Sequence, residues 1–305
     1  MNGRAAPRGP TPDGVLLLDK PAGITSTRAL AQAKRALGAS KAGHTGTLDP
    51  FATGLLPLAF GEATKFSRFL IDAEKAYEAT LRLGEETVTG DTESPASRTG
   101  VPIPDAAAIA DVVRRFVGRQ LQVPPMHSAV HVGGRRLYEY AREGLEVERE
   151  ARSIEIHALD IVTLDAPDLV LSVRCSKGTY VRVLAADIGR ALGCGAYLAA
   201  LRRTAVGPFR LADAVPLETL EQAGLTPARE RLLPVDALVR GLEPFAAGVE
   251  EAIHFSHGRV IPGGAPGGDP VAVYAPGGRF LGVAEPAPGG GLAPLRLMAE
   301  RIEIP

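Results

Sequence analysis

The chain has 305 residues, a formal net charge of −1 and a hydrophobic content of 45%, which is typical of a soluble globular protein of about two domains. No apolar run approaches the roughly 18 residues of a membrane span, and the arginine-containing N-terminus lacks the apolar segment of a secretory signal. Two distant cysteines and six scattered histidines fit no common metal-site spacing. We therefore expect a cytoplasmic protein without a disulfide framework, a metal or a membrane anchor.

The first third of the chain is predicted to form a tail followed by strands and helices. We expect residues 1–13 to form a flexible tail. The apolar run of residues 14–23 ends in Asp-Lys-Pro and Gly, which predicts a buried strand and a turn. Residues 25–38 carry both end signals of a helix, and residues 61–74 predict a second helix. Alternation over residues 75–84 predicts a strand.

The middle of the chain continues this mixture. Residues 105–117 predict a helix, and residues 153–164 and 168–178 predict two strands joined by a turn. A helix is expected over residues 179–193, ending at a glycine, and a strand over residues 196–209. Because the elements follow no strict βαβ repeat, the pattern indicates an α+β fold with an antiparallel or mixed sheet.

The composition and the hydrophobic pattern of the sequence change near Glu243. Long helical periods stop, and short apolar segments lie between clusters of Gly and Pro. This pattern indicates a small, mostly β domain. We therefore expect a main domain over residues 14–242 and a β-rich domain over residues 243–305.

The stretch GHTGTLDPFATGLLP contains a single carboxylate, that of Asp49. Its simplest interpretation is an Asp-Pro turn. The alternative is a nucleophile in a rigid loop, where glycines let a ligand approach the backbone and Pro50 fixes the chain after the acid. A hydrolytic glycosidase normally uses two carboxylates, and this loop supplies one.

The segment SKGTYVR places Tyr180 and Arg182 where a strand passes into a helix. Tyr180 is either a core residue or a phenol near a substrate. Arg182 is either solvated or the partner that keeps a buried carboxylate ionised. Tyr77, on the strand over residues 75–84, is either a packing residue or an aromatic face that stacks on a base.

A third segment combines basic and aromatic residues. Gly133 and Gly134 mark a hairpin tip, and three arginines follow it: Arg135, Arg136 and Arg142. Arginines interleaved with tyrosines are typical of an RNA-binding surface, although an amphipathic helix would show the same pattern. Residues 111–210 also carry a local excess of Lys and Arg.

These segments together resemble the TruB family of bacterial tRNA pseudouridine-55 synthases. The resemblance rests on seven segments in the family's order, namely GVLLLDKPAGITS, GHTGTLDPFATGLLP, GEATKFSRFL, KAYEATLRLGEETVTGDTE, LYEYAREG, CSKGTYVRVLAADIG and LRRTAVGPF. One departure is His127, which stands where the family pattern has a tyrosine. The segment after Glu243 matches the family's PUA domain only loosely.

The resemblance assigns roles to individual residues. The implied catalytic residues are Asp49, Tyr77 and Arg182. The implied substrate-binding residues are His44, Tyr77, Tyr180, Leu201 and Lys20, with His44 as the wedge that replaces a flipped base and Lys20 in a pair that we expect to be more structural than chemical. The candidate contacts to the RNA backbone are Arg135, Arg136, Arg142, Arg202 and Arg203.

The resemblance also implies a fold and a reaction. The fold is an α+β catalytic domain over residues 14–242, with an RNA-binding insertion over about residues 124–152 and a PUA-like domain over residues 243–305. The reaction is isomerisation of uridine 55 in the T-loop of tRNA, which needs no cofactor, metal or protein partner and suits a monomer. The alternatives are a tRNA-folding chaperone or RNA-binding protein, a pseudouridine synthase acting on another RNA and a nucleoside hydrolase.

Overall fold

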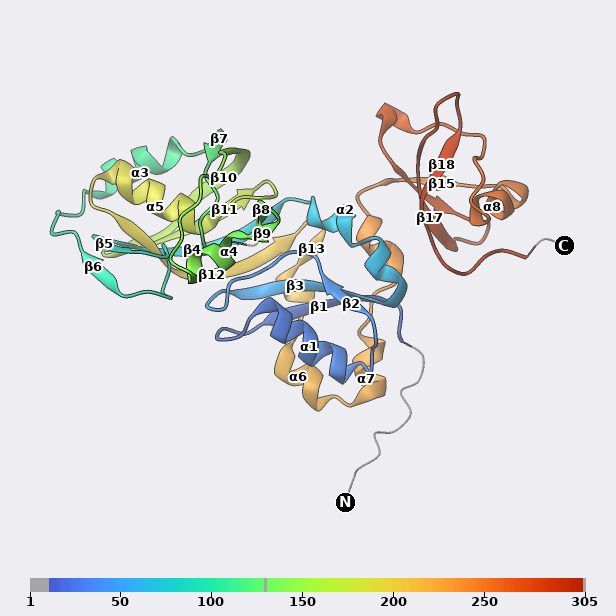
Figure 1. The fold of residues 1–305 in the computed structure, drawn as a ribbon, viewed down its shortest axis with the longest axis horizontal. Helices are drawn as coiled ribbons and strands as arrows, with labels where there is room; N and C mark the ends of the chain where they lie inside the picture. The colour runs from blue at the N-terminus through green and yellow to red at the C-terminus, as the bar shows by residue number, and fades with distance from the viewer. Residues whose placement is uncertain (1–10, 129–130, 304–305) are drawn as a thin grey trace, which may run out of the picture.

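The computed structural model describes residues 11–128 and 131–303 (Figure 1). Within this part of the chain a ten-stranded sheet forms the larger body and a four-stranded sheet forms the smaller one. The spatial order of the large sheet is β14 (Val215–Pro216), β1 (Gly14–Lys20), β3 (Thr53–Phe60), β12 (Ala196–Val206), β4 (Lys75–Leu83), β11 (Asp168–Cys175), β10 (Arg152–Asp165) and β7 (Gly118–Gln122). Two short strands extend it, β2 (Ala42–His44) on β3 and β13 (Phe209–Arg210) on β12.

The large sheet is mixed. β1 pairs with β14, and β3 with β12, in parallel, whereas the other pairs are antiparallel. Side chains alternate across β4: Tyr77 and Ala79 are buried, whereas Glu78 between them is exposed. This alternation follows from the pleat, and it gives the sheet two chemically different faces.

Helices cover the two halves of the sheet separately (Figure 1). α3 (Ala106–Arg114) and α5 (Val181–Leu192) share one hydrophobic core with β4, β10, β11 and β12. α1 (Ser26–Ala36), α6 (Leu217–Gln222) and α7 (Leu225–Glu230) share another core with β1 and β3. The opposite face of β1 and β3 packs against the 3-10 helices η1 (Gly61–Lys65) and η3 (Val235–Val239) and against α2 (Ser67–Ile71).

Local signals explain where the main helices begin and end. The Thr25 hydroxyl accepts a hydrogen bond from the Arg28 amide at the start of α1, and the Asp105 carboxylate accepts one from Ala108 at the start of α3. α5 ends at Gly193, which has φ +77°. Within α5, a Cβ on Gly189 would lie 2.1 Å from the Ala196 amide nitrogen, so the helix packs closely on β12 only because this residue is glycine.

The smaller sheet contains β15 (Glu243–Ala246), β16 (Val271–Tyr274), β17 (Phe280–Pro286) and β18 (Leu292–Leu297), packed against α8 (Val249–Ser256). It rests on the larger body through an edge-on ring contact between Phe66 and Phe280. The Glu62 carboxylate accepts a hydrogen bond from the Ala299 amide and pairs with Lys65. Apolar and polar contacts therefore join the two bodies.

The remaining short elements lie in connections between strands of the large sheet, except η4, which precedes β16 of the small sheet. They are β5 (Glu85–Thr87) and β6 (Ala96–Arg98), the hairpin β8 (His131–Val132) and β9 (Arg135–Arg136), α4 (Leu137–Arg142), η2 (Leu211–Asp213) and η4 (Pro266–Gly268). The expected hairpin tip is confirmed, since Gly133 and Gly134 have φ of +59° and +84°.

Most elements expected from the sequence are present, with three differences. The segment around Asp49 is more than a loop, because its second half enters β3, which is buried on both faces and therefore shows no alternation. The helix expected over residues 61–74 is divided into η1 and α2. Residues 1–10 of the expected tail lie outside the described residues, but the Asp13 carboxylate accepts a hydrogen bond from the Glu62 amide, so the tail is attached by its last residues.

Candidate active site

The loop that carries Asp49 is held on both sides of the acid. Before it, the Ser26 hydroxyl accepts a hydrogen bond from the Leu48 amide at 2.8 Å and donates to the Leu48 carbonyl at 2.9 Å. After it, the Pro50 carbonyl accepts hydrogen bonds from the Gly23 amide at 2.9 Å and from Lys20 Nζ at 3.3 Å. These contacts fix the position of the Asp49 backbone before any substrate is present.

Lys20 is a buried part of this support and does not line the cavity of Asp49, so its contact with substrate stays a prediction that this structure does not support. Its side chain is fully buried and also donates to the carbonyls of Pro21 and Ile24, both at 2.8 Å. Burial lowers the pKa of Lys20 to about 8, although the charge of Asp49 opposes that shift. Lys20 therefore acts on Asp49 through the loop and through its charge.

Arg182 joins Asp49 to a second carboxylate. Arg182 Nε lies 3.0 Å from Asp49 Oδ2, and Nη1 lies 3.2 Å from Asp91 Oδ2. Nη2 donates to the His127 carbonyl at 2.8 Å. Asp91 is itself fixed, since its Oδ1 accepts from the Thr89 hydroxyl at 2.6 Å. Arg182 and Asp91 are buried, so a rigid, desolvated guanidinium orients the Asp49 carboxylate.

Opposing effects act on the ionisation of Asp49. Burial raises its pKa, the Arg182 guanidinium lowers it, and the nearby Asp91 carboxylate raises it again. The net result is a pKa above the ordinary value for aspartate. A carboxylate with a raised pKa and an exposed edge, one-third of its side chain, is a more reactive base or nucleophile than a fully solvated one.

Tyr77 and Arg203 form a second buried pair beside this network. The two residues face each other in the register of β4 and β12, and the charge of Arg203 acts on the Tyr77 hydroxyl. Burial raises the pKa of Tyr77, which Arg203 opposes. Arg203 also donates to the Leu55 carbonyl at 2.7 Å and to the Gly46 carbonyl at 3.1 Å. Arg203 is 1% exposed and its donors are engaged inside the protein, so the structure gives no support to the expected contact with an RNA phosphate.

These groups line a cavity of about 520 Å³ that also contains Tyr180, Leu201 and His127. Tyr180 is held by the Gln122 amide group, which accepts from the Tyr180 nitrogen at 2.7 Å and donates to its carbonyl at 3.1 Å. The structure thus brings four segments together around Asp49. A uracil-sized planar ring could contact the carboxylate, the Tyr77 ring and the Leu201 side chain in this cavity.

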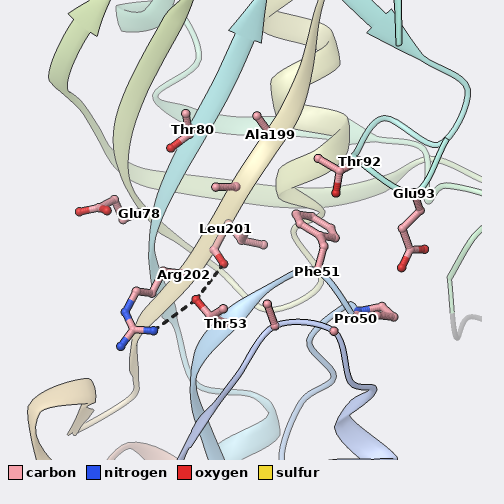
Figure 2. A pocket seen from close by; sticks show the side chains of 13 residues that line it. Pro50, Phe51, Thr53, Glu78, Thr80, Thr92, Glu93, Ala199, Leu201 and Arg202 are labelled. Atoms are coloured by element: carbon pink, nitrogen blue, oxygen red, sulfur yellow. Dashed lines mark hydrogen bonds between the residues drawn. The ribbon is translucent and has the colours of Figure 1, made fainter. Parts of the chain in front are cut away.

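Arg202 lies apart from this cavity. It lines a separate pocket of about 710 Å³ with Glu78 and Glu93 (Figure 2). Its guanidinium pairs with Asp19 at 2.8 Å and donates to the Thr53 hydroxyl at 3.2 Å. Arg202 therefore does not line the cavity of Asp49, in contrast to the expectation that both arginines of the pair contact the same RNA.

The other predicted residues lie near the cavity or on the insertion. His44, at the end of β2, is half-buried and does not line the cavity, and burial lowers its pKa. Arg135 stacks on the Tyr140 ring and pairs with Glu143 at 2.6 Å. Arg142 is the last residue of α4 and is exposed. The side chain of Arg136 lies outside the described residues.

Sequence reasoning missed several residues of this site. Asp91 and Gln122 hold Arg182 and Tyr180, and Ser26 holds the loop. Asp91 and Ser26 lie inside segments on which the resemblance rests, so the signal was present without an assigned role. Among the described residues, no group of three or more His, Cys, Asp or Glu side chains could hold a metal ion. Within the same ranges, no helix is long and apolar enough to span a membrane.

Comparisons with known proteins agree with this geometry. Three family models match the chain, described as TruB family pseudouridylate synthase (N terminal domain) over residues 34–181, tRNA pseudouridylate synthase B C-terminal domain over residues 182–240, and Pseudouridine synthase II TruB, C-terminal over residues 249–298.

Similar whole proteins extend the match. A tRNA pseudouridine synthase B of Dechloromonas aromatica (strain RCB) is 54% identical over 94% of this chain and 95% of its own. One of Burkholderia mallei (strain NCTC 10247) is 52% identical over 94% and 97%. A chain from the crystal structure of a Cbf5-Nop10-Gar1 complex has 27% identity and a TM-score of 0.74, covering 93% of this chain and 84% of that one. The α+β fold class is thereby confirmed, and the chain belongs to the TruB family of pseudouridylate synthases.

Proposed function

We propose that this enzyme converts uridine 55 in the T-loop of tRNA to pseudouridine, with Asp49 as the nucleophile. The similar proteins of Dechloromonas and Burkholderia carry the name tRNA pseudouridine synthase B, which supports tRNA as the substrate. The observation that carries the proposal is the Asp49 carboxylate, which is partly exposed in a cavity and held by the buried Arg182.

The reaction rearranges one nucleotide without loss or gain of atoms. The bond from N1 to C1′ breaks, the uracil turns, and C5 forms a new bond to C1′. The C5 proton then leaves and a proton is gained at N1. As the nucleophile, the Asp49 carboxylate forms a bond to C1′ of the ribose or to C6 of the uracil, and this bond breaks again before the product leaves. Arg182 keeps the carboxylate in place. Tyr77 stays protonated at neutral pH because its pKa is raised, so it offers a ring face and a relay for the C5 proton.

The target base must leave the folded T-loop to reach Asp49. Flipping a base costs a few kcal/mol, on the order of what stacking and pocket contacts return. We propose that the Tyr77 ring and Leu201 contact the flipped uracil, that Tyr180 borders the same cavity, and that His44 fills the vacated space. The β-rich domain from Glu243 onward and the insertion around Arg135 then contact other parts of the RNA. We further propose a cytoplasmic monomer that needs no protein partner or cofactor.

Tritium release tests this proposal. A T-stem-loop RNA labelled with tritium at uracil C5 is incubated with wild type, with Asp49→Asn, and with Asp111→Asn as a control for an exposed acid on α3. Wild type and the control should release one tritium per target uridine. Asp49→Asn should be slower by at least about a thousandfold, while its affinity for the RNA stays within about threefold, because only the nucleophile is lost.

The same experiment separates the alternatives. RNA binding without tritium release by wild type would favour an RNA-binding protein or chaperone. Release from an rRNA fragment but not from the T-stem-loop would favour a synthase for another RNA. Free uracil in the products would indicate a nucleoside hydrolase. Full activity of Asp49→Asn would remove Asp49 from the mechanism.

A further inference from the structure

Two cationic side chains at the rim of the Asp49 cavity take no part in the network around Arg182. Arg152 is the first residue of β10, and Lys177 lies in the turn that follows β11. Both side chains are exposed, and both line the same cavity as Asp49. Because β10 and β11 pair antiparallel, with Ile156 opposite Cys175, the start of β10 and the end of β11 lie at the same end of the sheet.

The charges that line the cavity are strongly unequal. Among the described residues that line it, one carboxylate, Asp49, faces five cationic residues, which are Lys75, Arg152, Lys177, Arg182 and Arg203. A cleft lined mostly by one sign of charge focuses the field and attracts ligands of the opposite sign. α5 also begins at this cavity without a side-chain cap and without an acidic residue in its first turn, which adds to the positive potential. The cavity is therefore suited to a polyanion.

Three of the five cations already have partners inside the protein. Arg182 binds carboxylates, Arg203 binds backbone carbonyls, and Lys75 donates to the carbonyls of Ile71 at 2.5 Å and Ala73 at 2.6 Å. They are buried, and they support the site rather than face solvent. The two exposed cations at the rim are the ones that a ligand can reach.

The side chain of Arg152 is unpaired. It makes no hydrogen bond or ion pair with any residue that the structure describes, whereas its backbone is fixed by pairing with Gln122. Gln122 is the same residue that holds Tyr180. An unpaired arginine on a rigid strand, beside a pocket for a base, has the geometry of a phosphate ligand. Lys177 has one exposed partner, Asp72 at 2.8 Å, which a phosphate could replace at little cost.

We propose that Arg152 and Lys177 form an entrance site for phosphodiester groups, which binds the RNA backbone next to the flipped uridine. The inference rests on the proposed function, since the flipped uridine is what brings the backbone to this rim. The arginine pair of β12 does not serve this purpose, because Arg203 is buried and Arg202 is paired with Asp19 and lines another pocket. The ligand is the sugar–phosphate backbone, so the site contributes affinity rather than recognition of the base.

The test measures binding and turnover of a T-stem-loop RNA over a range of salt concentrations. Arg152→Gln and Lys177→Gln should each raise Kd and KM by about five- to tenfold near 100 mM salt. Each should lower the slope of log K against log[salt] by about 0.7 to 0.9, the value for one lost phosphate contact. Arg152→Lys should keep most of the wild-type slope of log K against log[salt], because it keeps the positive charge. Arg115→Gln, which removes an exposed arginine at the end of α3, should change neither quantity.

Two matched variants distinguish the effect of losing the ion pair between Lys177 and Asp72 from the effect of losing a contact between Lys177 and RNA. Lys177→Gln and Asp72→Asn both break the pair between these residues, but only the first removes the cation. Asp72→Asn should therefore keep or improve RNA affinity. Equal losses in the two variants would overturn the proposal, since they would show a structural role for the pair.

Substitution in the RNA supplies an independent readout. A neutral methylphosphonate at the phosphates flanking the target uridine should weaken binding to wild type, and it should weaken binding to Arg152→Gln by less. Equal weakening would overturn the assignment of these phosphates to Arg152. If wild type releases no tritium from the RNA, the proposed function fails first; if wild type is active and Arg152→Gln keeps its Kd and salt slope, only the entrance site fails.

Discussion

Two adjacent arginines on β12 show how different the two faces of the central sheet are. Arg203 points to the face that carries Asp49 and Tyr77, where it is buried and bound to backbone carbonyls. Arg202 points to the other face, where it lines a pocket with Glu78 (Figure 2) and pairs with Asp19 outside that pocket. Neighbouring residues of a strand always face opposite ways, so a basic doublet in a strand cannot act as one patch.

The difference between the faces concerns burial as much as charge. On the Asp49 face, buried ionised groups hold the partly exposed catalytic carboxylate, since Arg182 and Asp91 are buried and Arg182 pairs with Asp49. On the other face, the ion pair of Arg202 and Asp19 is partly solvated, with side chains 41% and 23% exposed. Removing one partner of a buried pair leaves an uncompensated charge, whereas an exposed pair contributes little. Substitutions should therefore have large effects on the first face and small effects on the second.

Among substitutions of residues that do not touch the substrate, Asp91→Asn should have the largest effect on turnover and stability. Loss of its charge frees the Arg182 guanidinium on one side, so the Asp49 carboxylate is no longer held in one orientation. We expect a fall in the single-turnover rate of about a hundredfold, the size expected for a misplaced catalytic group. Because the charge of Arg182 then lacks one buried partner, the free energy of unfolding in urea should fall by about 3 kcal/mol.

The control for this variant is Asp187→Asn, which breaks a surface pair with Arg190. Its free energy of unfolding should change by less than about 1 kcal/mol, and its rate should stay at the wild-type value. A wild-type rate in Asp91→Asn would show that Arg182 keeps its position through its carbonyl contacts alone.

The pH dependence of the reaction should reflect the raised pKa of Asp49. Burial raises this pKa, Arg182 opposes the shift and Asp91 adds to it. Since the carboxylate must be ionised, kcat/KM should decline on the acid side from a pH above about 4, the ordinary range of aspartate, and by tenfold per pH unit below it. In Asp91→Asn the midpoint of this decline should move to lower pH, because one cause of the raised pKa is removed. An unmoved midpoint would assign the decline to another group.

The same pKa predicts how stability depends on pH. A folded-state pKa above the unfolded value means that folding favours the protonated form of Asp49. The stabilisation that this group contributes is therefore fully present at low pH and is lost as pH rises through the folded pKa. Because the asparagine side chain stays neutral, the free energy of unfolding of Asp49→Asn relative to wild type should increase from acid to neutral pH. Urea midpoints at several pH values measure the difference, and a constant difference would contradict the assignment.

Lys20→Met should affect turnover less than Asp91→Asn and should leave RNA affinity unchanged. The variant removes a donor from three carbonyls, including that of Pro50, and removes a positive charge that lowers the pKa of Asp49. We expect a rate about tenfold lower, a free energy of unfolding lower by about 1 to 3 kcal/mol and a Kd within about twofold. Lys41→Met, at an exposed lysine, is the control. A large rise in Kd would restore Lys20 as a substrate contact.

Local sequence patterns were sufficient to predict the strands and helices whose signals lie within a few neighbouring residues. The alternation of β4 and the end signals of α1 and α5 are confirmed, because each depends on neighbouring residues only. The strand β3 was missed, since a strand buried on both faces has no alternation and its residues resemble an apolar loop. The resemblance named Asp49 and Arg182, and the structure places them 3.0 Å apart, while their catalytic roles remain predictions.

The charged rim of the cavity could not be predicted from local patterns. The face on which Arg202 or Arg203 lies depends on the register of β12 and on its irregularities near Leu198 and Arg203. A shift by one residue would exchange the two side chains. Arg152 and Lys177 lie close together because β10 and β11 form the hairpin that the sequence predicted, but only the pairing of β11 with β4 places this end of the hairpin beside the Asp49 loop.

Arg202→Gln should have the smallest effect and gives the clearest test of the contrast between the faces. The substitution removes a partly exposed pair with Asp19, so the free energy of unfolding should fall by at most about 1 kcal/mol. Because Arg202 does not line the cavity of Asp49, kcat, Kd and the salt slope of RNA binding should all stay within about twofold of wild type. Arg152→Gln, measured in parallel, removes an equal charge from the other face and should lose about one phosphate contact. If Arg202→Gln lowered the salt slope as much as Arg152→Gln, the RNA would reach both faces of the sheet, and positive charge on the catalytic face alone would not account for binding.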